Sequence, residues 1–207
     1  MKKRKIILGI GTGRCGSKSL AALLNKQPLI ECGIEKYKHD WYSLNWRRHL
    51  REAIMDRSAK IKGDVAFFHL PLVIKMKYDK PNDIDLKTIL LVRNKDEFVE
   101  SVCKRFKDRG EPLSEKRNSY YQFAKEKGMD YRPTFDYTVP KYFAYTSLKD
   151  MAARFWEDYN LAVKQHNLDY FELKTQELNS TEKIREALAY IGIPDKEQYV
   201  EKIRITY

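Results

Sequence analysis

The chain has 207 residues, and its 40 Lys and Arg residues outnumber its 29 Asp and Glu residues, which gives a formal net charge of +11. A hydrophobic fraction of 43% and an aromatic fraction of 13% exclude a disordered chain and supply enough apolar side chains for a core. The basic residues are interspersed with acidic ones outside the block at residues 2–5, so the charge argues against a nucleic-acid partner and suits an enzyme with an anionic cofactor.

The cysteine content and the amino terminus bear on the compartment. Cys15, Cys32 and Cys103 are odd in number and far apart, which argues against a disulfide framework and favours a reducing compartment. The apolar run at residues 6–10 is too short for a signal peptide or a membrane span. We therefore expect a cytoplasmic protein with no membrane span, folded as a single domain over residues 1–207.

The first predicted elements are a strand at residues 5–10, a glycine-rich loop at residues 11–19 and a helix at residues 20–25. Glycines let a loop turn its backbone N–H groups inward, and the amino terminus of the helix attracts an anion. Cations and hydroxyls add further donors, and they are supplied by Arg14, Ser17, Lys18 and Ser19. This pattern predicts a phosphate-binding loop.

The loop departs from the Gly-x-x-x-x-Gly-Lys-[Ser/Thr] pattern of ATP and GTP sites. Ser17 intervenes after Gly16, so Lys18 comes one residue late, and a shift of one helical position turns a side chain by about 100°. Such sites also need an acidic Mg²⁺ partner, commonly at the end of a neighbouring strand. The predicted strand at residues 87–92 ends instead in Arg93, a cation, so no metal site is predicted.

Further strands are predicted at residues 28–32 and 64–68. His69 follows the second of these strands, at the carboxyl end where open α/β sheets place their ligands. A helix is predicted over residues 95–109, and Ser101 borders its apolar face.

Aromatic residues gather between residues 120 and 145, inside a segment at 107–146 whose composition differs from the rest of the chain. This insertion could cover a sugar or phenol acceptor, form a small helical lid with its own core, or make a subunit contact. A helix is then predicted from Ser147, a last strand at residues 169–173, and a final helix that is capped at Asn179 and stops at Gly192.

Two motifs together resemble the sulfotransferases that use 3′-phosphoadenosine 5′-phosphosulfate (PAPS). Arg14-Cys-Gly-Ser-Lys-Ser-Leu20 resembles their 5′-phosphosulfate loop, and Arg93-Asn-Lys-Asp-Glu-Phe-Val-Glu-Ser101 resembles their 3′-phosphate motif. His69-Leu-Pro71 is similar to the sequence that supplies a catalytic base in the cytosolic branch. The resemblance covers residues 5–106 and 147–194.

The resemblance implies a three-layer α/β fold with a central, mostly parallel sheet of about five strands, similar to P-loop nucleotide kinases. It also implies PAPS as the cofactor, adenosine 3′,5′-bisphosphate as the product and no metal requirement. The resemblance further implies a catalytic role for Arg14 and Lys18. The cofactor-binding residues that it implies are Arg14, Cys15, Gly16, Ser17, Lys18, Ser19, Arg93 and Ser101.

Two departures point away from the cytosolic branch. That branch has a lysine two residues before its histidine, where this chain has Phe67, and it ends in a glycine- and lysine-rich motif that is missing here. The chain therefore looks nearer to the short bacterial or heparan-modifying type. In that type the base is commonly a glutamate after the second strand, which makes Glu35 the rival of His69 as catalytic base.

The expected function is transfer of a sulfuryl group from PAPS to a hydroxyl or amine of an acceptor such as a carbohydrate or phenol. One alternative is a P-loop kinase that uses Mg²⁺ and ATP with a distorted loop. Another is a nucleotide-binding interaction module without turnover, for which the aromatic segment would be the partner surface. The sequence leaves the acceptor, the strand order and the oligomeric state open.

Overall fold

The computed structural model describes residues 3–34, 61–65, 70–78, 82–108 and 147–200. The strands in these ranges are β1 (Arg4–Gly11), β2 (Ile30–Ile34), β3 (Ile61–Val65), β4 (Ile84–Val92) and β5 (Phe171–Lys174). The helices are α1 (Ser17–Asn25), α3 (Leu70–Tyr78), α4 (Lys95–Asp108), α6 (Leu148–Gln165) and α7 (Thr181–Tyr190), with short 3₁₀ helices η3 (Thr175–Asn179) and η4 (Asp195–Glu197).

The strands form one parallel sheet in the order β2-β3-β1-β4-β5. Strands β1 and β4 are neighbours along their length, from the pair Arg4 and Ile84 to the pair Gly11 and Leu91. Their carboxyl ends therefore lie side by side, although a long stretch of sequence separates them. Ligands of open parallel sheets bind at such carboxyl ends.

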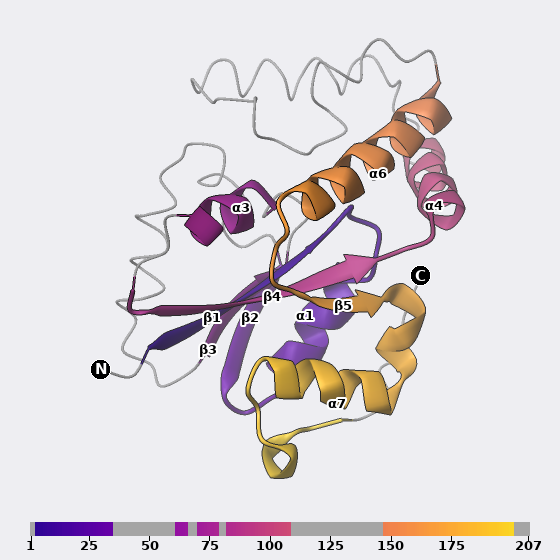
Figure 1. The fold of residues 1–207 in the computed structure, drawn as a ribbon. Helices are drawn as coiled ribbons and strands as arrows, with labels where there is room; N and C mark the ends of the chain where they lie inside the picture. Colours follow the sequence, from indigo (N-terminus) through magenta and orange to yellow (C-terminus); the bar gives the residue numbers. More distant parts are fainter. Residues whose placement is uncertain (1–2, 35–60, 66–69, 79–81, 109–146, 201–207) are drawn as a thin grey trace.

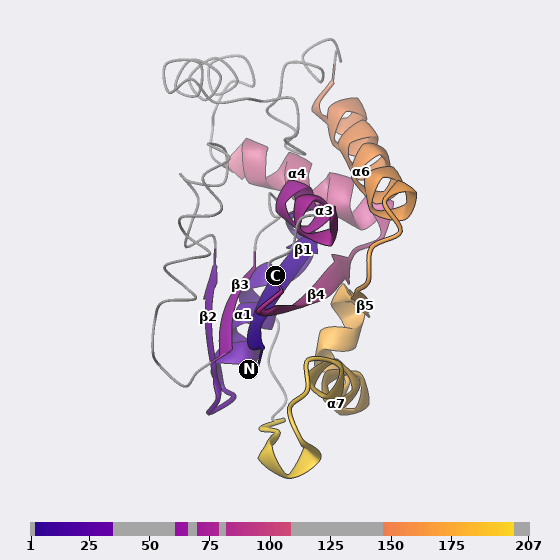
Figure 2. The same cartoon turned by 60° about the vertical axis from the view of Figure 1, so that its left-hand side comes forward.

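Helices cover both faces of the sheet (Figures 1 and 2). Alternate side chains of β1 point to opposite faces, so that Leu8 packs with α3, α4 and α6 while Ile7 packs with α1 and α7. The chain thus passes from β1 into α1 on one face of the sheet and from β4 into α4 on the other face. In open α/β sheets, ligands bind in the crevice at the carboxyl ends of two such strands. The predicted three-layer α/β fold with a five-stranded parallel sheet is confirmed.

Local hydrogen bonds explain where α4, α6 and α7 begin. Asn94 precedes α4, and its Oδ1 accepts a hydrogen bond of 2.9 Å from the Asp96 amide. Ser147 caps α6 in the same way, with 3.0 Å between its Oγ and the Asp150 amide. The cap of α7 is Ser180 and not Asn179, so the predicted start of this helix is one residue too early.

Several predicted boundaries differ from the structure by a few residues. The strand predicted at residues 28–32 lies at Ile30–Ile34, and the strand predicted at 64–68 lies at Ile61–Val65. The insertion predicted at 107–146 begins inside α4, which continues to Asp108, and its residues 109–146 lie outside the described residues. The prediction of one domain over residues 1–207 stays a prediction. Within the described ranges, no helix combines the length and the apolar character that crossing a membrane requires.

Candidate functional site

The loop between β1 and α1 has a backbone suited to an anion. Gly13, Arg14 and Gly16 have positive φ angles of 78°, 54° and 94°. Where right-handed and left-handed residues alternate in a short loop, as at Arg14, Cys15 and Gly16, successive N–H groups converge on one point. For Arg14, which is not a glycine, this conformation costs roughly 1–2 kcal/mol, so contacts from the rest of the fold must stabilise it.

The first turn of α1 leaves amides for a ligand. The first hydrogen bond of the helix runs from the Leu20 amide to the Gly16 carbonyl, with a length of 2.9 Å. The amides of Ser17, Lys18 and Ser19 therefore precede any acceptor within the helix, and Gly16 has no side chain to cap them. These amides and the positive end of the helix dipole favour a bound phosphate or sulfate.

Close packing explains two of the loop glycines. A Cβ atom at Gly11 would lie 2.6 Å from the Leu91 carbonyl oxygen, at the end of β4. A Cβ atom at Gly16 would lie 2.5 Å from Cδ1 of Leu178, in η3. The loop is therefore fitted between the end of β4 and η3, and only glycine leaves the necessary space.

The two sequence motifs meet at this loop. The Arg14 guanidinium donates a hydrogen bond of 3.1 Å from Nε to Oγ of Ser101 on α4. Arg93, directly after β4, donates a hydrogen bond of 2.7 Å from Nη1 to the carbonyl oxygen of Arg14. The fold thus joins Arg14, Arg93 and Ser101, which the sequence placed in separate motifs.

Arg14 and Arg93 place two cations where the motifs meet. Arg14 is exposed, whereas the side chain of Arg93 is only 14% exposed. Glu97, one turn along α4, places its Oε2 3.4 Å from Nε of Arg93, and its Oε1 accepts a hydrogen bond of 3.2 Å from Gln176. One carboxylate therefore orients Arg93 and offsets part of the positive charge.

Residues outside the motifs hold the backbone of the site. The Gly11 amide donates a hydrogen bond of 2.9 Å to the hydroxyl of Tyr159 on α6, and Trp156 of the same helix donates one of 3.0 Å to the Arg93 carbonyl. Thr175 Oγ1 lies 3.1 Å from the carbonyl oxygens of both Cys15 and Val92. No sequence motif points to these contacts, although a tyrosine within an apolar helical face is a signal, because its buried hydroxyl needs a partner.

Cys15 differs from what its position suggests. From the sequence, Cys15 is expected to be a small spacer beside the phosphate, and a position near the amino terminus of a helix can lower the pKa of a thiol. In the structure its side chain is 1% exposed, and burial raises the pKa of the thiol to about 12. Burial therefore has a larger effect on this pKa than the position at the helix terminus.

The two candidate bases, His69 and Glu35, lie outside the described residues and stay predictions. Their described neighbours are informative, because β2 ends at Ile34 and β3 ends at Val65, and these two residues are partners in the sheet. Both strands therefore end at the same edge of the sheet as the phosphate loop.

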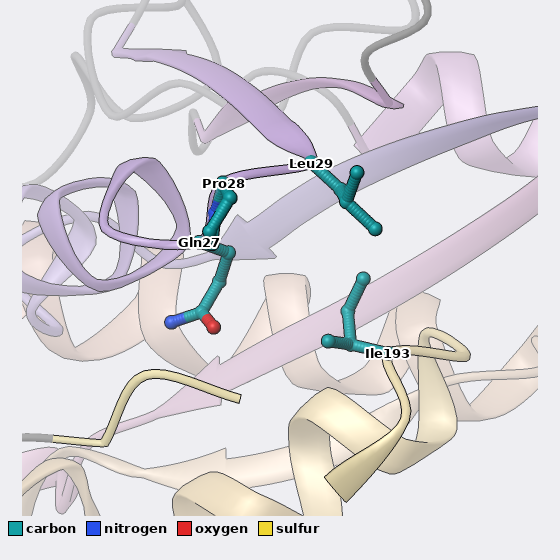
Figure 3. Close-up of a pocket in the computed structure, with 4 residues that line it drawn as sticks. All are labelled: Gln27, Pro28, Leu29 and Ile193. Carbon is teal, nitrogen blue, oxygen red and sulfur yellow. The ribbon is translucent and has the colours of Figure 1, made fainter. Parts of the chain in front are cut away.

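A pocket of about 230 Å³ lies elsewhere in the molecule (Figure 3). Its lining comes from the turn between α1 and β2 and from the residue before Pro194, and consists of Gln27, Pro28, Leu29 and Ile193. This turn precedes β2 at the amino-terminal edge of the sheet, opposite the phosphate loop, so the pocket is separate from the candidate site.

Comparison with known proteins adds evidence on the fold. No family model matches the sequence, and no curated protein matches it. Among solved structures, the crystal structure of a sulfotransferase from Alicyclobacillus acidocaldarius is similar, with a TM-score of 0.62 and 17% sequence identity. The match covers 100% of this chain and 87% of that chain. At this identity the likeness shows a shared fold.

Proposed function

We propose that this chain is a sulfotransferase that transfers a sulfuryl group from PAPS to a hydroxyl or amine of an acceptor such as a carbohydrate or phenol. The observation that carries the proposal is the meeting of Arg14, Arg93 and Ser101 beside a phosphate-type loop, through the two hydrogen bonds from Arg14 to Ser101 and from Arg93 to Arg14. The shared fold with a sulfotransferase supports it.

The donors at this sheet edge fit a nucleotide that is charged at two positions. For the 5′ side, the loop offers the amides of the first turn of α1 and the cations Arg14 and Lys18. For the 3′ side, Arg93 and Ser101 offer a guanidinium and a hydroxyl, which suit a phosphate dianion. Cys15 would contribute only its backbone, because its thiol is buried.

PAPS, when bound, supplies the sulfuryl group and leaves as adenosine 3′,5′-bisphosphate. Arg14 and Lys18 would stabilise the negative charge that develops on the leaving phosphate during transfer. His69 or Glu35 would accept the proton of the attacking hydroxyl or amine. This scheme needs no carboxylate at the end of β4, where Arg93 stands in place of the acidic Mg²⁺ partner of ATP sites.

Transfer itself tests this proposal. Purified protein with ³⁵S-labelled PAPS and a panel of sugars, phenols and amines should label at least one acceptor in the presence of EDTA. Ligand-induced thermal stabilisation separates the alternatives. A ligand at 100 times its Kd adds about 2.7 kcal/mol to the free energy of unfolding, which raises the Tm of a domain of this size by about 5–10 °C.

The outcomes differ between the three functions. A Tm rise with adenosine 3′,5′-bisphosphate in EDTA, together with labelled acceptor, supports the sulfotransferase. A Tm rise only with ATP and Mg²⁺ would replace it with a kinase. Binding of the bisphosphate without any labelled product would favour an interaction module.

The rival bases can be separated once an acceptor is known. His69→Ala should lower turnover by roughly 10²–10⁴ if the histidine is the base, and the acidic limb of the pH profile should then disappear. Normal turnover in His69→Ala, with Glu35→Gln inactive but still able to bind the nucleotide, would assign the proton transfer to Glu35.

A further inference from the structure

The phosphate loop has a conformation that needs support from outside. Arg14 has a φ of 54°, in the left-handed region that side chains disfavour. In an anion-binding loop, amides must point toward the ligand and carbonyl groups away from it. In a trans peptide the carbonyl oxygen of one residue and the N–H of the next point in opposite directions, so fixing a carbonyl also fixes the following amide.

Two consecutive carbonyl groups of this loop are fixed from the same region of the fold. The Arg14 carbonyl accepts a hydrogen bond of 2.7 Å from Arg93, and the Cys15 carbonyl lies 3.1 Å from Oγ1 of Thr175. The amides that follow them, those of Cys15 and Gly16, must then point the opposite way. These contacts therefore set the direction of two loop amides.

Thr175 also joins the loop to the strand that precedes Arg93. Its Oγ1 lies 3.1 Å from the carbonyl oxygen of Val92, the last residue of β4, as well as 3.1 Å from that of Cys15. The hydroxyl has one proton, which the two carbonyl groups share. Thr175 is 2% exposed, so water cannot readily replace this proton donor if it is lost.

Tyr159 fixes the other end of the loop. Its hydroxyl accepts a hydrogen bond of 2.9 Å from the Gly11 amide, and the side chain is 0% exposed. The loop is thus held at Gly11 from α6 and at Cys15 from η3. Both contacts come from residues that follow the insertion in sequence and belong to neither nucleotide motif.

We propose that Thr175 and Tyr159 are positioning residues that hold the phosphate loop in its anion-binding conformation before any ligand arrives. The inference rests on the proposed function in so far as the ligand of this loop is the phosphate of a nucleotide. It assigns to these two hydroxyls the preorganisation of the site, which lowers the ordering cost that binding would otherwise include.

Two substitutions at Thr175 separate the effect of its hydroxyl group from the effect of its methyl group. Thr175→Val keeps the shape and removes the hydroxyl, whereas Thr175→Ser keeps the hydroxyl and removes the methyl group. Affinity for adenosine 3′,5′-bisphosphate, measured by titration calorimetry at a temperature at which all variants are folded, should fall about three- to tenfold in Thr175→Val. In Thr175→Ser the affinity should stay close to that of the wild type, even if its Tm falls.

Tyr159→Phe should lower the affinity by a similar factor, and Tyr190→Phe is its matched control. Tyr190 lies on α7, and its ring packs on Phe171 with 5.8 Å between the ring centroids, so removal of its hydroxyl leaves the loop contacts intact. Equal losses of affinity in both phenylalanine variants would mean that any tyrosine hydroxyl matters equally, and would overturn the assignment for Tyr159.

Hydrogen exchange of the ligand-free protein tests the same inference without a nucleotide. Backbone amides at residues 11–19 should exchange about three- to tenfold faster in Thr175→Val and Tyr159→Phe than in the wild type, with no such change in Thr175→Ser or Tyr190→Phe. If the wild type fails to bind the bisphosphate but the exchange follows this pattern, the proposed function is wrong and the positioning role stands. The positioning role would be overturned if the two variants exchanged at the wild-type rate. It would also be overturned if the wild type bound the bisphosphate and the two variants bound it with the same affinity.

Discussion

Arg93, which is proposed to bind the 3′-phosphate, also contacts the phosphate loop. Its guanidinium donates to the Arg14 carbonyl and lies beside Glu97, so the Arg93 side chain also shapes the loop. Replacing Arg93 with alanine should therefore weaken the contacts to both the 5′ and the 3′ phosphate of a bound nucleotide. Ser101 is the more selective probe, since its hydroxyl meets the Arg14 guanidinium without touching the loop backbone in the described contacts.

We expect Ser101→Ala to weaken the binding of adenosine 3′,5′-bisphosphate by about 1.5–3 kcal/mol, because a doubly charged phosphate would lose a hydroxyl donor. The affinity for adenosine 5′-phosphate should change little. Titration calorimetry with both nucleotides gives the difference directly. An equal loss for both would show that Ser101 supports the loop and does not recognise the 3′ group.

The cysteines yield a prediction about reactivity. Burial raises the pKa of Cys15 and of Cys32 to about 12, so both thiols should stay protonated at pH 8. Cys103 is only partly buried. Iodoacetamide at pH 8 should therefore modify Cys103 first in the folded protein, as measured by peptide mass spectrometry, while urea-unfolded protein should react at all three.

Rapid alkylation of Cys15 in the folded state, blocked by adenosine 3′,5′-bisphosphate, would contradict the buried thiol. The helix dipole lowers a thiol pKa, but burial has the larger effect on Cys15.

At the scale of elements, the amino terminus of α1 depends on its contact with η3. Gly16 combines a φ of 94° with a Cβ position only 2.5 Å from Cδ1 of Leu178. Gly16→Ala should lower the free energy of unfolding by roughly 1–3 kcal/mol, through backbone strain and displacement of Leu178. Chemical denaturation measures this loss.

Gly9→Ala is the control for Gly16→Ala. Its Cβ would lie 2.7 Å from Cγ1 of Val65, and its φ is not positive, so this substitution tests similar crowding without left-handed strain. The loss of stability should be smaller than at Gly16. Equal losses would mean that crowding alone explains both, and that the left-handed backbone of Gly16 is not needed.

The kinds of elements could largely be predicted from the sequence, but several of their ends could not. Apolar runs indicate β1 and β4, because both faces of these strands are buried, and helical spacing indicates α1, α4 and α6, because each buries one apolar face. The boundaries of β2 and β3 were missed by two or three residues, since short apolar runs do not show where strand pairing begins. The contacts of Tyr159 and Thr175 join residues about 150 positions apart, and no local pattern encodes them.

For the molecule as a whole, the strand order makes the candidate site. The sequence placed Arg14 after one strand and Arg93 after another, but only the order β2-β3-β1-β4-β5 makes those strands neighbours. The hydrogen bonds between Arg14, Arg93 and Ser101 follow from that adjacency. The motifs could therefore be found from the sequence, whereas their convergence required the fold.

The central claim is that one sheet edge binds a nucleotide charged at both its 5′ and 3′ positions. It can be tested by comparing two titrations in calorimetry. Wild-type protein in EDTA is titrated with adenosine 3′,5′-bisphosphate and, separately, with adenosine 5′-phosphate. Each charge-assisted contact to the 3′-phosphate, from Arg93 and from Ser101, is worth about 1.5–3 kcal/mol, so the bisphosphate should bind at least about 10-fold more tightly. Equal affinity for the two nucleotides, or binding of ATP with Mg²⁺ and of neither adenosine phosphate, would contradict the account.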